Sequence, residues 1–125
     1  MVTLQEMLSS AKDEVPQVTA EEAHELISGR DALLVDVRDA PELTTQGKLR
    51  GAVNVSRGML EFRADPGGTY HNPEFRRARP VILYCASGGR SALAGKTLRD
   101  MGYTEVYNLG GFKDAAADGF PTEPA

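Results

Sequence analysis

The stretch PVILYCASGGRSALAGKTLRDMG, residues 80–102, carries the patterns of a strand, a tight turn and a helix in direct succession. Residues 80–85 form a short apolar run, typical of a strand that is buried on both faces of a sheet. Residues 86–89 are glycine or small, which permits a sharp change of direction. The helix predicted next has three apolar residues on one face and a glycine at its end, namely Leu93, Leu98, Met101 and Gly102.

Three further runs share the character of residues 80–85: ALLVDV (32–37), GAVNV (51–55) and TEVYNL (104–109). Helical segments separate them. This alternation predicts an α/β fold, with a mostly parallel central sheet of about five short strands and helices on both faces. In such sheets, ligands bind beyond the carboxyl ends of the strands. Cys85, the last residue of its run, is therefore expected at the ligand-binding edge.

The N-terminal segment, residues 1–16, is predicted to form a helix ahead of the main domain, residues 17–125, within one globular unit. Its apolar face consists of Leu4, Met7, Leu8 and Ala11, and Pro16 ends it. A second helix is expected to begin with a capping box of Thr19 and Glu22 and to end at Gly29. Residues 63–73 are predicted to form a surface loop, and the tail from residue 118 a loosely attached terminus.

Composition excludes several classes of protein. The 125 residues carry a net charge of −4, which argues against a general nucleic-acid binder. No stretch approaches the roughly 20 apolar residues of a membrane helix, and the first residues lack a secretory pattern, so a cytoplasmic location is expected. The single cysteine cannot form an internal disulfide, and His24 and His71 give no zinc-like spacing. We therefore expect no metal.

Cys85 is the residue whose surroundings suggest nucleophilic chemistry. An isolated cysteine at a strand end is most often an inert core residue. Here a turn of small residues and a helix start follow at once, so successive backbone N–H groups and the helix dipole point toward one place. Such a cup favours the thiolate, and thiol pKa values there fall to about 3.5–7.5. The residues expected to form the cup are Ala86, Ser87, Gly88, Gly89, Arg90 and Ser91.

Two stretches together resemble the rhodanese, or sulfurtransferase, domain family: DVRDAPELTTQGKLRGAVNV (36–55) and YCASGGRSALAGKTLRDMGYTEVYNLGGF (84–112). Cys85, Gly88, Arg90 and Ser91 match the motif C-x-x-G-x-R-S. The resemblance implies that Cys85 takes a sulfane sulfur from a small anionic donor such as thiosulfate and becomes a persulfide. The outer sulfur then passes to cyanide, a thiol or a protein, and no cofactor is required.

Charged side chains at the rim of the cup and beyond it receive separate expectations. Arg90 is expected to hold an anion at the rim, and Arg57, which follows the second strand, to attract one from the same edge. Asp36 and Arg38 are assigned a structural role, with Arg38 paired to Glu42 at the i, i+4 spacing. Three positions depart from the family pattern: Lys48, Ser56 and Ala115, the last standing where many members have tryptophan.

Two other functions remain open at this stage. Cysteine phosphatases and arsenate reductases also use a thiolate in an amide cup, with the signature C-x5-R-[ST]; here Arg90 comes one residue sooner. A non-catalytic module that binds a protein or senses oxidants through Cys85 is the second alternative. The physiological donor and acceptor, the choice between monomer and homodimer, the role of the N-terminal helix, and whether residues 63–73 cover the site are likewise open.

Overall fold

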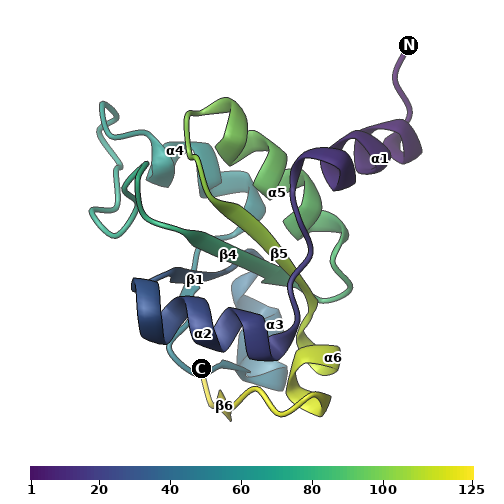
Figure 1. Ribbon diagram of the computed structural model, residues 1–125, viewed down its shortest axis with the longest axis vertical. Helices are drawn as coiled ribbons and strands as arrows, with labels where there is room; N and C mark the ends of the chain where they lie inside the picture. The colour runs from purple at the N-terminus through teal and green to yellow at the C-terminus, as the bar shows by residue number, and fades with distance from the viewer.

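A parallel sheet of four strands forms the centre of the computed structural model, which describes residues 1–125 (Figure 1). The strands lie in the order β3-β1-β4-β5, and every neighbouring pair is parallel. Their bounds are β1 Leu33–Asp36, β3 Val53–Asn54, β4 Val81–Cys85 and β5 Val106–Gly111. The predicted α/β class and parallel sheet are confirmed, although the sheet has four strands and not five.

Helices cover both faces of this sheet. They are α1 Leu4–Glu14, α2 Ala20–Arg30, α3 Ala40–Gln46, α4 Leu60–Ala64, α5 Gly89–Asp100 and α6 Phe112–Ala117, with a 3-10 turn η1 at Arg57–Met59. α4 and α5 lie on one face, with α1 packed along α5, and α2 and α6 lie on the other (Figure 1). None of these helices combines the length and apolarity that crossing a bilayer requires.

Each face of the sheet has its own core. In β4, the side chains of Val81, Leu83 and Cys85 join the core under α4 and α5. Ile82 and Tyr84 point the opposite way, into the core under α2 and α6. Because successive side chains of a strand alternate between faces, two cores require an uninterrupted apolar run. That requirement is the physical reason for the sequence VILYC.

The start of α2 is as predicted and its end is not. Thr19 and Glu22 form the expected capping box, with Glu22 N–H donating to Thr19 Oγ1 and Thr19 N–H donating to Glu22 Oε1. The helix continues through Gly29 to Arg30. Asp31 then ends it in the left-handed conformation, φ 54°, which aspartate tolerates better than most residues.

The C-terminal tail is attached to the domain, contrary to the prediction. β6 (Thr122–Glu123) pairs antiparallel with β2 (Lys48–Leu49) in a separate two-stranded sheet. Phe120 is buried in the core under α2 and α6. The Glu123 carboxylate also lies 3.1 Å from Lys48 Nζ and accepts the Gly51 N–H at 2.9 Å. The prediction weighed the two prolines of the tail and missed its one aromatic anchor.

β5 carries an irregularity beside the end of β4. The register is Leu83 opposite Asn108 but Tyr84 opposite Gly110, so one residue of β5 is left over as a bulge. The segment before α2 also pairs with this strand: Asn108 N–H donates to Pro16 O at 2.9 Å, and Val18 N–H donates to Asn108 O at 3.0 Å. Asn108 itself stays in the regular register opposite Leu83, and its side chain lies on the α5 face of the sheet.

Candidate active site at the end of strand β4

Cys85 ends β4, and the chain then turns directly into α5. Gly88 precedes the helix in a left-handed conformation, φ +96°, which a residue with a Cβ rarely adopts. A Cβ at this position would also lie 3.3 Å from the Cα of Gly110. The glycine therefore allows the loop to lie against the end of β5 while its N–H points back toward Cys85.

Polar donors surround the sulfur of Cys85, although the residue is only 1% exposed. Gly88 N–H donates to Sγ at 3.0 Å, and Ser91 Oγ lies 3.4 Å from it. Burial raises the pKa of the thiol, but hydrogen bonds lower it by more and hold it below its ordinary value. Their donors are the Ser91 hydroxyl and the backbone N–H groups of Ser91, Ser87 and Gly88. The amides thus face the sulfur, an arrangement that favours the thiolate over the thiol.

A buried amide side chain that sequence reasoning does not select completes this arrangement. Asn108 Oδ1 lies 2.8 Å from Ser91 Oγ and accepts the Gly110 N–H at 2.9 Å. Its Nδ2 donates to the backbone carbonyl of Gly88 at 3.2 Å. The available signal is one amide residue inside the apolar run 104–109, at a position that a covered parallel sheet buries.

Arg90 does not point a free charge at the loop. Its two terminal nitrogens donate to the Glu42 carboxylate of α3 at 2.9 and 3.0 Å. This bidentate pair lowers the pKa of Glu42 to about 2 and raises the pKa of Arg90. The predicted pair between Arg38 and Glu42 is therefore wrong, because Glu42 reaches across to α5 instead.

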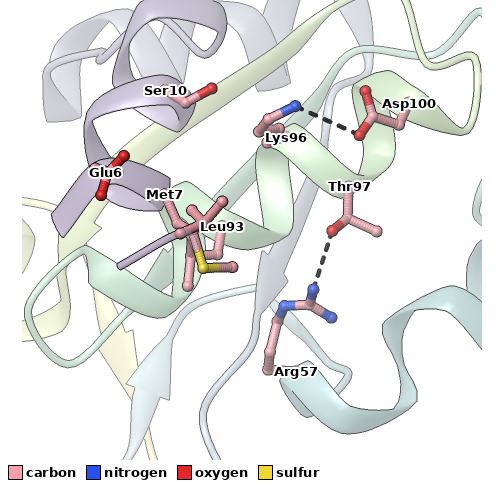
Figure 2. A pocket seen from close by; sticks show the side chains of 9 residues that line it. Glu6, Met7, Ser10, Arg57, Leu93, Lys96, Thr97 and Asp100 are labelled. Carbon is pink, nitrogen blue, oxygen red and sulfur yellow. Dashed lines mark hydrogen bonds and ion pairs between the residues drawn. The ribbon is translucent and has the colours of Figure 1, made fainter. Parts of the chain in front are cut away.

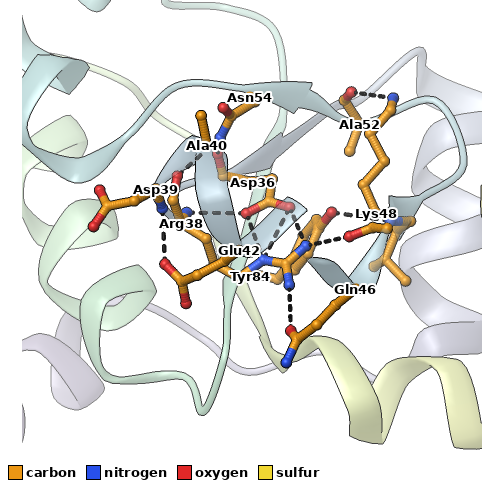
Figure 3. Close-up of polar contacts among 12 residues, drawn as sticks. Asp36, Arg38, Asp39, Ala40, Glu42, Gln46, Lys48, Ala52, Asn54 and Tyr84 are labelled. Atoms are coloured by element: carbon orange, nitrogen blue, oxygen red, sulfur yellow. Dashed lines mark hydrogen bonds and ion pairs between the residues drawn. The ribbon is translucent and has the colours of Figure 1, made fainter. Parts of the chain in front are cut away.

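Arg38 is fully buried beneath the site and holds the neighbouring loops together (Figure 3). Its guanidinium donates to the Asp36 carboxylate at 2.8 Å, to Gln46 Oε1 at 3.0 Å and to Gly47 O at 2.8 Å. It also lies 4.4 Å from the ring centroid of Phe112, the first residue of α6. The expected structural role of this pair is thus present, with Asp36 as the partner.

Arg57 is not brought to Cys85. Its guanidinium donates to Glu61 at 3.0 Å and to Thr97 Oγ1 at 3.0 Å, two turns along α5 from the loop. Figure 2 shows it at the edge of a hollow between α1 and α5, together with Met7 and Leu93. The structure separates this residue from the rest of the predicted anion-binding set.

A second hollow adjoins the loop at Ser87. It is bounded by the start of α2, the glycine pair of β5 and the outer side of α6, including Gln17, Thr19, Gly111, Asp114, Ala115 and Asp118. Ala115, where many family members have tryptophan, lies in this lining. The 63–73 loop lies elsewhere, beside α4 and the amino end of β4 (Figure 1), where its residues line a separate hollow with Phe62.

No group of three or more His, Cys, Asp and Glu residues is arranged to hold a metal ion. The chemistry available at the end of β4 is therefore that of one ionisable sulfur, one hydroxyl and several backbone amides. Backbone amides and the N-terminus of a helix stabilise a nearby negative charge through hydrogen bonds and the helix dipole. The arrangement suits a sulfur nucleophile that bears charge before and after it reacts.

Comparison with known proteins identifies one family, with relatives whose descriptions differ. The family model described as Rhodanese-like domain matches residues 19–118. The chain is 42% identical over 85 residues to the uncharacterized protein YqhL of Bacillus subtilis, covering 67% of this chain and 60% of that protein. It is 34% identical over 97 residues to a sulfurtransferase of Allochromatium vinosum, covering 77% and 82%. A solved structure from Rhodopseudomonas palustris, described as a possible tyrosine phosphatase, is 38% identical, with a TM-score of 0.88 over 98% of this chain and 96% of that one.

Proposed function

The chain belongs to the rhodanese-like domain family, and from this premise we propose that it is a sulfurtransferase with Cys85 as its sulfur carrier. The observation that carries the proposal is the convergence of loop donors on one sulfur. Gly88 N–H and the Ser91 hydroxyl lie within 3.0 and 3.4 Å of Sγ, and the pKa of the thiol is lowered. A purely structural cysteine in this core would gain nothing from such donors.

The proposed reaction has two displacements. In the first, the Cys85 thiolate attacks the sulfane sulfur of a donor; an S–S bond forms, and the donor's bond to that sulfur breaks with its electron pair leaving on the donor remnant, sulfite in the case of thiosulfate. In the second, cyanide or an acceptor thiolate attacks the outer sulfur of the persulfide. The Cys85 thiolate leaves with the electron pair, and the enzyme returns to its starting state.

The amide cup serves both displacements because negative charge is present throughout. It lies on Sγ in the free enzyme and on the outer sulfur in the persulfide. Backbone N–H groups of Ser87, Gly88 and Ser91 are fixed by the loop and by α5, so they stabilise that charge without reorganising. No cofactor enters the scheme.

The hollow beside Ser87 is the proposed approach for the acceptor. It adjoins the loop directly, and its lining includes carboxylates and backbone edges that an incoming thiol compound or protein segment can contact. A reduced cysteine that must stay free of disulfides works best in a reducing compartment, so we place the reaction in the cytoplasm.

Phosphatase chemistry is less well supported by the same loop. Six residues run from Cys85 to Arg90, one fewer than the signature of cysteine phosphatases. A phosphate bound there needs the guanidinium as a bidentate partner, and both terminal nitrogens of Arg90 are already on Glu42. Sulfur transfer requires neither a larger loop nor a free arginine.

Mass spectrometry tests the proposal directly. After incubation with thiosulfate, the protein should gain one sulfur atom, cyanide should remove it as thiocyanate, and Cys85→Ser should gain none. An unchanged mass with every donor tried, including a glutathione persulfide, would mean a non-catalytic module. Release of phosphate from para-nitrophenyl phosphate without thiocyanate formation would instead support the phosphatase function.

A further inference from the structure

The hydroxyl of Ser91 lies between two acceptors and has one proton. Cys85 Sγ is 3.4 Å away on one side, and Asn108 Oδ1 is 2.8 Å away on the other. A hydroxyl donates one hydrogen bond at a time and accepts others through its lone pairs. Its proton therefore goes to the sulfur or to the amide, and the charge on the sulfur decides which.

Asn108 is held so that it can act as the alternative acceptor. Its Nδ2 donates to Gly88 O at 3.2 Å, and its Oδ1 accepts the Gly110 N–H at 2.9 Å. These two contacts fix which end of the amide faces Ser91. Because Gly110 N–H also donates to Oδ1, Asn108 keeps a hydrogen-bond donor there when the Ser91 proton turns away. The β5 bulge and the pairing with residues 16–18 hold the backbone of Asn108 in place.

We propose that Asn108 is a positioning residue that receives the Ser91 hydrogen bond whenever Sγ is uncharged and returns it to Sγ whenever Cys85 is a thiolate. In the thiol, S–H donates to Ser91 Oγ, and Oγ–H donates to Asn108 Oδ1. In the thiolate, Oγ–H donates to Sγ. In the persulfide of the proposed reaction, the charge has moved to the outer sulfur, and Oγ–H returns to Asn108. The hydroxyl rotates, and its proton stays on Oγ in each state.

A consequence is that Asn108 opposes the ionisation of Cys85. Asn108 stabilises the states in which Sγ is neutral, because only in those states does the Ser91 hydroxyl donate to Asn108 Oδ1. The thiol pKa is thus set by competition between sulfur and amide for one proton. The charged groups facing this region are Arg90 of α5, Glu42 of α3 and Asp114 of α6, and all three stay unchanged in the variants below.

The test measures the ionisation of Cys85 through the pH dependence of its alkylation by iodoacetamide. Asn108→Leu removes the acceptor, so the Cys85 pKa should fall, by about one unit, or tenfold in thiolate fraction. Asn108→Asp strengthens the acceptor, so the pKa should rise. In a Ser91→Ala background, the Leu effect should disappear, and the Asp effect should shrink to that of the added charge. Far-UV circular dichroism checks that each variant is folded.

Two results would overturn the inference. If Asn108 only supports the loop, both substitutions loosen the Gly88 donor and raise the pKa together. If the effects of Asn108 do not pass through Ser91, they are the same with and without its hydroxyl. Should Asn108→Leu fail to fold, the comparison of Asn108→Asp with and without Ser91 still decides. Alkylation needs no sulfur transfer, so its outcome does not depend on the proposed function. Only the persulfide step of the inference rests on that function.

Discussion

Arg90 and Glu42 face one another across the gap between α5 and α3 through two hydrogen bonds of 2.9 and 3.0 Å. The single arginine of the loop is therefore neutralised before any substrate arrives. The neighbouring loop residues Ala86 and Ser87 bring no charge. In the proposed reaction, a dianion such as thiosulfate would meet backbone amides without a free cation, and a donor of lower charge would meet a smaller penalty.

Releasing Arg90 should change donor preference. Glu42→Gln removes the negative charge beside the Arg90 guanidinium, so kcat/KM for thiosulfate should rise about threefold to tenfold relative to kcat/KM for glutathione persulfide. The ratio of the two donors is the measurement, because it cancels effects on Cys85 itself. Glu61→Gln, which releases Arg57 away from the loop, is the matched control and should leave the ratio unchanged. Equal ratios in all three proteins would show that the pair does not affect donor choice.

The pair of Arg90 and Glu42 also makes the free energy of unfolding depend on pH. The pKa of Glu42 is 4.5 when free and about 2 in the folded protein. A carboxyl with a depressed folded pKa stabilises above its unfolded pKa and loses that contribution as pH falls toward the folded value. The free energy of unfolding should therefore drop between pH 5 and pH 2, by roughly 1 kcal/mol from this partly exposed pair. Urea denaturation across this pH range should show a smaller drop in unfolding free energy for Glu42→Gln. An equal drop in the variant and the unmodified protein would contradict the assignment.

Gly88→Ala tests the loop geometry. A Cβ there is strained at φ +96° and meets Gly110 Cα at 3.3 Å, so we expect the loop to shift and the Gly88 N–H to move away from Sγ. We expect a loss of about 1–3 kcal/mol in unfolding free energy, together with a higher Cys85 pKa in iodoacetamide titrations. Gly58→Ala, which has open space around its Cβ, is the control. A folded Gly88→Ala protein with normal alkylation would remove the Gly88 amide from the account of Cys85.

Arg38→Met should be strongly destabilising. It leaves the fully buried Asp36 carboxylate without its cation, at a cost of about 3–5 kcal/mol for a broken buried pair. Arg30→Met removes an exposed partner of Glu105 and should change stability little. Chemical denaturation measures both. Similar small losses in the two variants would contradict the stabilising role assigned to the buried pair of Arg38 and Asp36.

The sequence predicts well wherever the signal is local. The apolar runs give the strands because burial on two faces favours apolar residues at most positions, and the capping box of Thr19 and Glu22 gives the start of α2. The glycines after Cys85 give the turn. These features depend on the spacing of residues a few positions apart, which can be read directly from a single sequence.

Long-range partners are where prediction fails. Glu42 is four residues from Arg38, yet Arg38 lies buried on Asp36, and Glu42 turns to Arg90 of a distant helix. The pairing of β6 with β2 and the contact of Asn108 with Ser91 likewise join segments far apart in the chain. Each depends on how elements pack, and one sequence does not display that.

The hydrogen bonds from residues 16 and 18 to β5 have a practical meaning for anyone trimming this chain. The family match begins at residue 19. A fragment that starts there lacks Pro16 and Val18, the backbone hydrogen-bond partners of Asn108, and exposes the outer edge of β5 to solvent. The amide that orients Ser91 would then be anchored by one side of its strand alone. Residues 16–18, although they precede the family match, therefore brace the strand that carries Asn108.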